Sequence, residues 1–115
     1  MARENQERGC VTINRETILQ NEIRIALSKH GICIRQNTGN FLTADGRRVV
    51  CGIPGLSDLL FIGADGVAFI EVKTDTGRPT KEQLNFIRAV HKLNHRAGIA
   101  RSVDDALKIA GVLKP

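Results

Sequence analysis

The sequence predicts a single α/β domain in which a small mixed sheet is flanked by helices. Its 115 residues suit one domain, and its 42% hydrophobic and 25% charged residues are ordinary for a packed protein. Apolar residues change between helical and strand spacing in the order α-β-β-β-α-β-α. We place the domain at residues 14–115, and we expect the polar residues 1–13 to be disordered or to serve as an arm.

The first predicted helix runs from about Asn14, a favoured N-cap residue, to His30, after which Gly31 suits the helix stop. Its apolar stripe at helical spacing consists of Leu19, Ile23, Ala26 and Leu27. Glu22 falls inside this stripe, and a carboxylate that faces the interior needs a partner. The alternative is a stripe rotated so that Glu22 sits at its edge.

Strand spacing follows in residues 32–37, and a second short strand is allowed near 48–51. Between them we predict a turn-rich loop at 38–47, because glycine, asparagine and aspartate there favour turns. These segments precede the hairpin that forms the centre of the predicted sheet.

That hairpin consists of two apolar runs, 58–62 and 67–73, joined by Gly63-Ala64-Asp65-Gly66. A tight turn closed by its two glycines sets Asp58 opposite Glu71. A two-residue turn at Asp65-Gly66 would instead set Asp58 opposite Lys73, with Glu71 as the diagonal neighbour. Either register keeps the three side chains on one face, because side chains alternate along a strand.

The last third of the chain returns to helical spacing. A second long helix is predicted from Thr80 to about His95, followed by a short strand at 98–101. Residues 103–110 are predicted to form a closing helix, with Ser102 as its N-cap.

The charge and composition of the chain limit the classes of molecule that it is expected to bind. Seventeen Lys and Arg against twelve Asp and Glu give a net charge of +5, which attracts phosphate-rich polymers, although a merely basic soluble protein has the same balance. Only 3% of the residues are aromatic, which disfavours binding of single strands by base stacking. Three widely spaced cysteines indicate neither a disulfide framework nor a zinc site. With no apolar run of membrane-spanning length and no signal peptide, we expect a cytoplasmic protein.

Asp58 and Glu71 form the pair that points to chemistry. Like charges placed opposite each other in a sheet repel by about 3 kcal/mol at an effective dielectric near 20. A divalent cation that takes an oxygen from each carboxylate offsets this repulsion, and Lys73 lies two residues beyond Glu71 on the same face. Such a cation polarises a phosphate and acidifies a bound water molecule. Taken alone, a glutamate and a lysine at this spacing are also common on a solvated strand.

The wider pattern resembles the VRR-NUC family of the PD-(D/E)xK nuclease superfamily. The resemblance rests on G-I-P-G-L-S-D at 52–58, F-I-E-V-K at 69–73 and G-R-P-T-K-E-Q at 77–83. It covers roughly residues 22–102. One departure is Ser57, where the motif has a proline, at a position that contributes no ligand.

The resemblance implies a restriction-endonuclease-like core, α-β-β-β-α-β, and a metal-dependent DNA endonuclease. It implies Asp58, Glu71 and Lys73 as catalytic residues. It also implies that Asp58, Glu71 and the backbone carbonyl of Val72 bind the cation, Mg²⁺ or Mn²⁺.

Two further positions match residues of that family. A glutamate on the first helix corresponds to Glu22, with a catalytic role or a metal contact through water. A glutamine on the helix after the lysine corresponds to Gln83, which the resemblance places near the metal or the attacking water. Thr80 and Gln83 also form a capping box, so the residues alone favour a helix cap, and both roles can hold at once.

Partners follow from the resemblance and from charge. Small stand-alone members of the family are homodimers associated with branched DNA such as Holliday junctions, in replication and repair. Basic residues flanking the centre are expected to contact phosphates, namely Arg35, Arg47, Arg48, Arg78 and Lys81. A nuclease that nicks, or trims flaps and ends, and a non-catalytic nucleic-acid-binding module are the rival interpretations.

Overall fold

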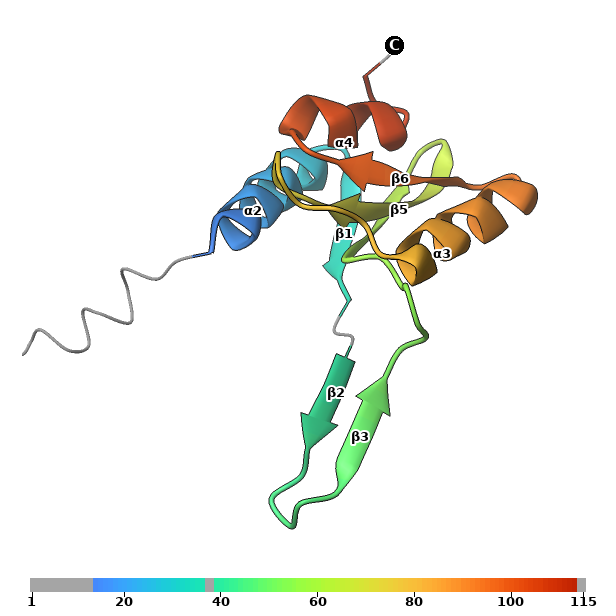
Figure 1. The fold of residues 1–115 in the computed structure, drawn as a ribbon. Coiled ribbons are helices and arrows are strands. Elements are labelled where there is room, and N and C mark those ends of the chain that lie inside the picture. The colour runs from blue at the N-terminus through green and yellow to red at the C-terminus, as the bar shows by residue number, and fades with distance from the viewer. Residues whose placement is uncertain (1–13, 37–38, 114–115) are drawn as a thin grey trace, which may run out of the picture.

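A four-stranded mixed sheet forms the centre of the structure, a computed structural model that describes residues 14–36 and 39–113 (Figure 1). The strand order is β1-β4-β5-β6, with the first two pairings antiparallel and β5 parallel to β6. A separate pair consists of β2 and β3. The elements are α2 (Arg15–Ser28), β1 (Gly31–Arg35), β2 (Gly39–Leu42), β3 (Arg48–Cys51), β4 (Leu59–Gly63), β5 (Gly66–Val72), α3 (Lys81–Lys92), β6 (Arg96–Ala100) and α4 (Val103–Ile109).

Helices cover both faces of the sheet, and the alternation of side chains along β5 shows which face each helix takes. Ala68, Ile70 and Val72 belong to the larger core, which α2 and α4 complete. Phe69 points to the opposite face and packs edge-on against Phe86 of α3, with ring centroids 5.3 Å apart. Because side chains alternate, Glu71 shares the face of Phe69 and lies on the α3 side.

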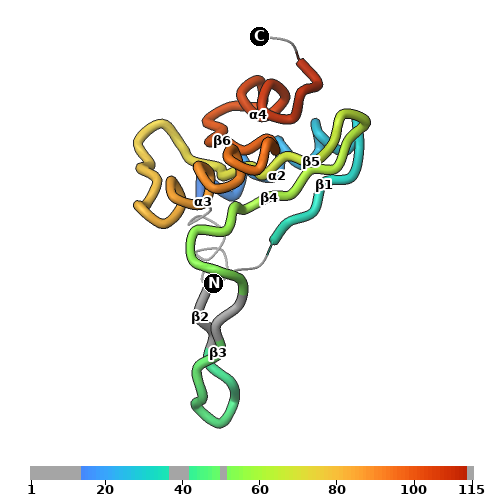
Figure 2. The backbone as a smooth tube through the Cα atoms, turned by 90° about the vertical axis from the view of Figure 1, so that its right-hand side faces the viewer, coloured from blue at the N-terminus to red at the C-terminus, as the bar shows by residue number. Residues whose placement is uncertain are grey.

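The β2–β3 hairpin extends away from the helices and the main sheet (Figures 1 and 2). Its two strands pair only with each other among the described residues. The prediction of a loop throughout 38–47 is therefore wrong for Gly39–Leu42, while the short strand at 48–51 is confirmed. The residues of this segment favour turns, so they do not by themselves indicate a strand. The strand forms because it pairs with β3, not because of its own β propensity.

The helix starts agree with the sequence analysis. Asn14 caps α2 by accepting a hydrogen bond from the Glu16 N–H at 2.7 Å, and Ser102 caps α4. The second long helix ends at Lys92, earlier than expected, because Asn94 adopts the left-handed conformation with a φ of 66°. As a result, β6 begins at Arg96 instead of residue 98.

The predicted fold class, a mixed α/β domain with a small sheet flanked by helices, is confirmed. The expected arm at residues 1–13 lies outside the described residues. Among the helices of residues 14–113, none combines the length and the apolar character needed to cross a membrane.

Candidate functional site

The β4–β5 hairpin fixes which residues face each other at its open end. Gly63 pairs with Gly66 at the turn, and the same register continues to the pair Leu59 and Ile70. One step further, it sets Asp58 opposite Glu71. The first of the two registers considered for this hairpin is therefore confirmed, and the turn at Asp65-Gly66 is wrong.

Asp58 stands directly before β4 and is held by both neighbouring strands. Its Oδ2 accepts a hydrogen bond from the Val72 N–H at 2.9 Å, and its carbonyl accepts one from the Gln36 N–H at 2.8 Å. The bend that precedes it contains Gly52 and Gly55, both with positive φ angles. The Val72 N–H thus fixes the carboxylate at the end of β5, while the Gln36 N–H holds the backbone of Asp58 from the other side.

Glu71 is the most buried acid of the site, with 2% of its surface exposed. Its Oε2 accepts a hydrogen bond from Nε2 of Gln83 at 2.8 Å and lies 3.6 Å from Nζ of Lys73. Its Oε1 is buried and has no hydrogen-bond partner among the described residues. Burial, and next the charge of Asp58, raise the pKa of Glu71 to about 8, against the opposing charge of Lys73.

Gln83 forms the predicted capping box and also contacts Glu71 of the acid pair. Its Oε1 accepts a hydrogen bond from the Thr80 N–H at 2.8 Å, and Oγ1 of Thr80 accepts one from the Gln83 N–H at 3.1 Å. This capping box starts α3, while Nε2 of the same side chain reaches Glu71. The start of the helix and the geometry of the site therefore depend on one side chain.

Lys73 follows β5 and keeps its ammonium group beside Glu71. Its side chain is 14% exposed, and its backbone N–H donates to the Ala100 carbonyl at 3.1 Å. A single lysine neutralises only one of two carboxylates, so the site carries a net negative charge once both Asp58 and Glu71 are ionised, and this state favours a cation.

The structure places the acid of the first helix differently from the prediction. Glu22 is exposed on α2, so the expectation that it faces the interior is wrong, and the rotated stripe is the correct alternative. Glu16, half-buried in the first turn, is the α2 acid whose charge contributes to the raised pKa of Glu71. Extending the buried positions Leu27, Ile23 and Gln20 back by four residues leads to Glu16, and this signal was missed.

The five predicted phosphate-binding residues are all exposed, namely Arg35, Arg47, Arg48, Arg78 and Lys81. They occupy three places. Arg35 ends β1, the pair at 47–48 lies on the projecting β2–β3 hairpin, and the residues at 78 and 81 flank the start of α3. Arg47 is paired with Asp45 at 3.2 Å, which reduces its net charge contribution.

The oxygen atoms of the site fit a hard divalent cation. Two adjacent carboxylates, one with a buried oxygen that lacks a partner in the described part of the chain, form the kind of donor set that Mg²⁺ or Mn²⁺ prefers. Within residues 14–36 and 39–113, no group of three or more His, Cys, Asp and Glu side chains is arranged around a metal position. A cation here would therefore complete its coordination with backbone, water or phosphate oxygens.

Comparisons with known proteins give one informative result. No family profile and no curated protein matches the chain. Among solved structures, one described as a VRR_NUC domain is 22% identical, with 86% of this chain and 97% of that chain covered and a TM-score of 0.61. This chain has the VRR_NUC fold. The resemblance inferred from the motifs is thereby confirmed for the fold, and the coverage shows that the chain spans nearly the whole VRR_NUC domain it matches.

Proposed function

We propose that this chain is a metal-dependent nuclease that hydrolyses phosphodiester bonds in DNA. The observation that carries the proposal is the buried Glu71 carboxylate beside Asp58 and Lys73, one oxygen of which has no hydrogen-bond partner among the described residues. The printed name of the similar structure, a VRR_NUC domain, points in the same direction. The basic charge of the chain suits a polyphosphate substrate.

Asp58, Glu71 and the carbonyl of Val72 are the groups that would hold Mg²⁺ or Mn²⁺. The N–H and C=O of one strand residue point to the same side, and the Val72 N–H donates to Asp58. The Val72 carbonyl therefore also faces the Asp58 side. When bound there, the cation supplies charge that polarises the scissile phosphate and acidifies a water molecule.

The remaining residues of the site orient Glu71 or stabilise charge on the substrate. Lys73 stabilises the negative charge on the non-bridging phosphate oxygens as water attacks phosphorus and the bond to the leaving oxygen breaks. Gln83 fixes Glu71 through the hydrogen bond to Oε2. Glu16 takes the place that the sequence analysis gave to Glu22, since its charge acts on Glu71.

Cleavage of labelled DNA in Mg²⁺, Mn²⁺ or EDTA tests the proposal. We expect cutting only with a divalent cation, and a loss of more than about 100-fold in Asp58→Asn and Asp58→Ala, with DNA binding retained. Asp65→Asn, at the other end of the same hairpin, serves as the control and should cut normally. Binding without cleavage by the unsubstituted chain in either cation would favour the non-catalytic binding module.

We further propose branched DNA as the substrate and a homodimer as the active form. Both proposals rest on the motif resemblance. The β2–β3 hairpin, which carries Arg47 and Arg48, extends away from the main sheet and could contact DNA at a distance from the carboxylate pair. Equal cutting of junction, flap, single-stranded and duplex DNA would favour the nicking or trimming alternative. Sedimentation equilibrium decides between monomer and dimer.

A further inference from the structure

Arg101, directly after β6, makes contacts that connect it to the loop between β5 and α3. Its Nη1 donates to the carbonyl of Thr74 at 2.5 Å and to the carbonyl of Gly77 at 2.8 Å. The side chain is half-buried. A guanidinium with two carbonyl acceptors in one loop restrains that loop as a unit.

The restrained loop lies between two residues of the site. It begins immediately after Lys73, and its end leads into the capping box of Gln83. The Gly77 N–H donates to the Thr74 carbonyl at 3.1 Å and closes a turn. A Cβ at Gly77 would lie 3.4 Å from Cδ of Lys73, so this turn supports the aliphatic stem of the lysine.

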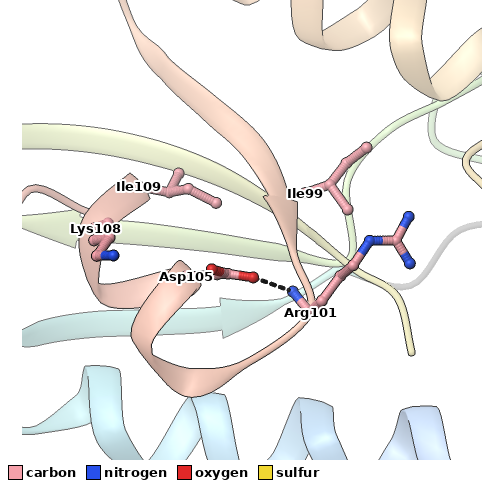
Figure 3. Close-up of a pocket in the computed structure, with 5 residues that line it drawn as sticks. All are labelled: Ile99, Arg101, Asp105, Lys108 and Ile109. Atoms are coloured by element: carbon pink, nitrogen blue, oxygen red, sulfur yellow. Dashed lines mark hydrogen bonds between the residues drawn. The ribbon is translucent and has the colours of Figure 1, made fainter. Parts of the chain in front are cut away.

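Arg101 is itself anchored from the other side. Its backbone N–H donates to Oδ2 of Asp105 at 2.9 Å, and Asp105 belongs to the first turn of α4. Figure 3 shows the guanidinium extending away from Asp105 and Lys108. The carboxylate therefore holds the backbone of Arg101, and the guanidinium is free to bind the loop.

We propose that Arg101 is a positioning residue, whose guanidinium clamps the turn 74–77 beneath Lys73 and so fixes the lysine ammonium beside Glu71. The inference rests on the proposed nuclease function for its catalytic consequence. The loop geometry that it invokes is independent of that function. Two separate measurements therefore test it.

The first measurement is a double-mutant cycle on DNA cleavage. We expect Arg101→Ala to lower kcat by about tenfold or more while KM for DNA changes by less than about twofold. In a Lys73→Ala background the same change should cost less than about twofold, because the clamp acts through the lysine. An equal loss in both backgrounds, or an effect on KM alone, would overturn the proposal.

Arg96 provides the matched control. It lies at the other end of the same strand and donates from Nη1 to the Asp65 carbonyl at 3.1 Å. Arg96→Ala removes a comparable contact between an arginine and a loop, far from the site, and should leave kcat unchanged. Arg101→Lys keeps a cation that can reach a carbonyl, and we expect it to recover part of the lost kcat.

The second measurement needs no cleavage. Lys73 is 14% exposed, so an amine-selective reagent should label it slowly in the folded protein. In Arg101→Ala the labelling of Lys73 should rise severalfold, while that of Lys92 stays constant and thermal unfolding confirms that the variant folds. If the unsubstituted chain cuts no DNA, the nuclease proposal fails, yet unchanged labelling of Lys73 would still overturn the clamp.

Discussion

Glu71 is the residue on which the electrostatics of the site depend. Its burial beside Asp58 raises its pKa to about 8, so without a cation the carboxyl group is largely protonated at neutral pH. Gln83 and Lys73 compensate only Oε2, since Oε1 has no partner in the described part of the chain. The protonated form of Glu71 is therefore favoured in the absence of a cation, and the carboxyl group can bind a cation only after it loses its proton.

This arrangement predicts a pH-dependent stability in EDTA. The folded state holds the Glu71 proton up to about pH 8, whereas the unfolded state releases it near the ordinary pKa of 4.5. The folded state therefore binds more protons in this window, and the free energy of unfolding falls as the pH rises through it and levels off above. Glu71→Gln lacks this titration.

Denaturant unfolding of the two proteins at several pH values checks the prediction. The stability advantage of Glu71→Gln over the unsubstituted chain should grow by more than about 1.4 kcal/mol between pH 4.5 and 8, the equivalent of one pKa unit. Parallel curves for the two proteins would show that Glu71 titrates normally in the folded state.

Gln83 allows its two roles to be separated. Gln83→Glu keeps a side chain suited to a capping box but replaces the amide that donates to Glu71 with a carboxylate. We expect the helix content to be retained while cleavage falls by about tenfold or more, because the new carboxylate would repel Glu71 instead of donating a hydrogen bond to it.

Circular dichroism and cleavage rates measure these two effects. Gln83→Ala should lose both the cap and the contact, and so it serves as the comparison. Normal cleavage by Gln83→Glu would leave Gln83 with the capping role alone.

The acids of the site could be predicted only where short-range sequence patterns determine their positions. The alternation of a strand was enough to place Asp58, Glu71 and Lys73 on one face, but two turns fitted the sequence, and only the structure selects the register that sets Asp58 opposite Glu71. The α2 acid was misplaced, because several rotations of the helix fit the same apolar residues and only packing selects one. Glu16 lies at the end of the stripe where no apolar residue marks it.

At the scale of elements, the bend before β4 and the start of α3 are packed backbone to backbone. A Cβ at Gly55 would lie well inside van der Waals contact with the carbonyl oxygen of Glu82, and Gly55 itself has a φ of 82°. The bend carries Asp58, and the helix carries Gln83. Gly55 therefore determines how closely these two parts of the site approach.

We expect Gly55→Ala to destabilise the protein by about 2–4 kcal/mol, from backbone strain together with overpacking. Gly46→Ala is the control, because Gly46 has a similar φ of 88° and open space where a Cβ would be. It should cost only the backbone part, about 1 kcal/mol. Thermal or denaturant unfolding gives both values, and equal losses would contradict a role for the close contact.

Elements with their own start signals were predictable, and an element defined by its partner was not. The starts of α2, α3 and α4 could be predicted from Asn14, Thr80 and Ser102, because a helix cap is a local hydrogen bond. The strand β2 has no such signal, since its pairing with β3 is a property of both segments.

For the whole molecule, the carboxylate pair predicts a link between cation binding and stability. A cation that needs ionised Asp58 and Glu71 competes with the Glu71 proton, so it stabilises the fold more as the pH rises. We expect millimolar Mn²⁺ to raise Tm by several degrees at pH 8 and by less at pH 6. Differential scanning calorimetry of the unsubstituted chain and of Asp58→Asn tests this, and the same shift in both proteins would mean that the cation binds elsewhere.

The connection of the β2–β3 hairpin has a consequence for how this fold can vary. The hairpin leaves the chain between β1 and β4, which are neighbours in the main sheet, and it contributes no residue to either core cluster of the described residues. Lengthening, shortening or exchanging it would leave the strand order and the carboxylate pair in place. If the proposed nuclease function holds, exchanging this hairpin should therefore change which DNA the chain binds without disturbing the carboxylate pair.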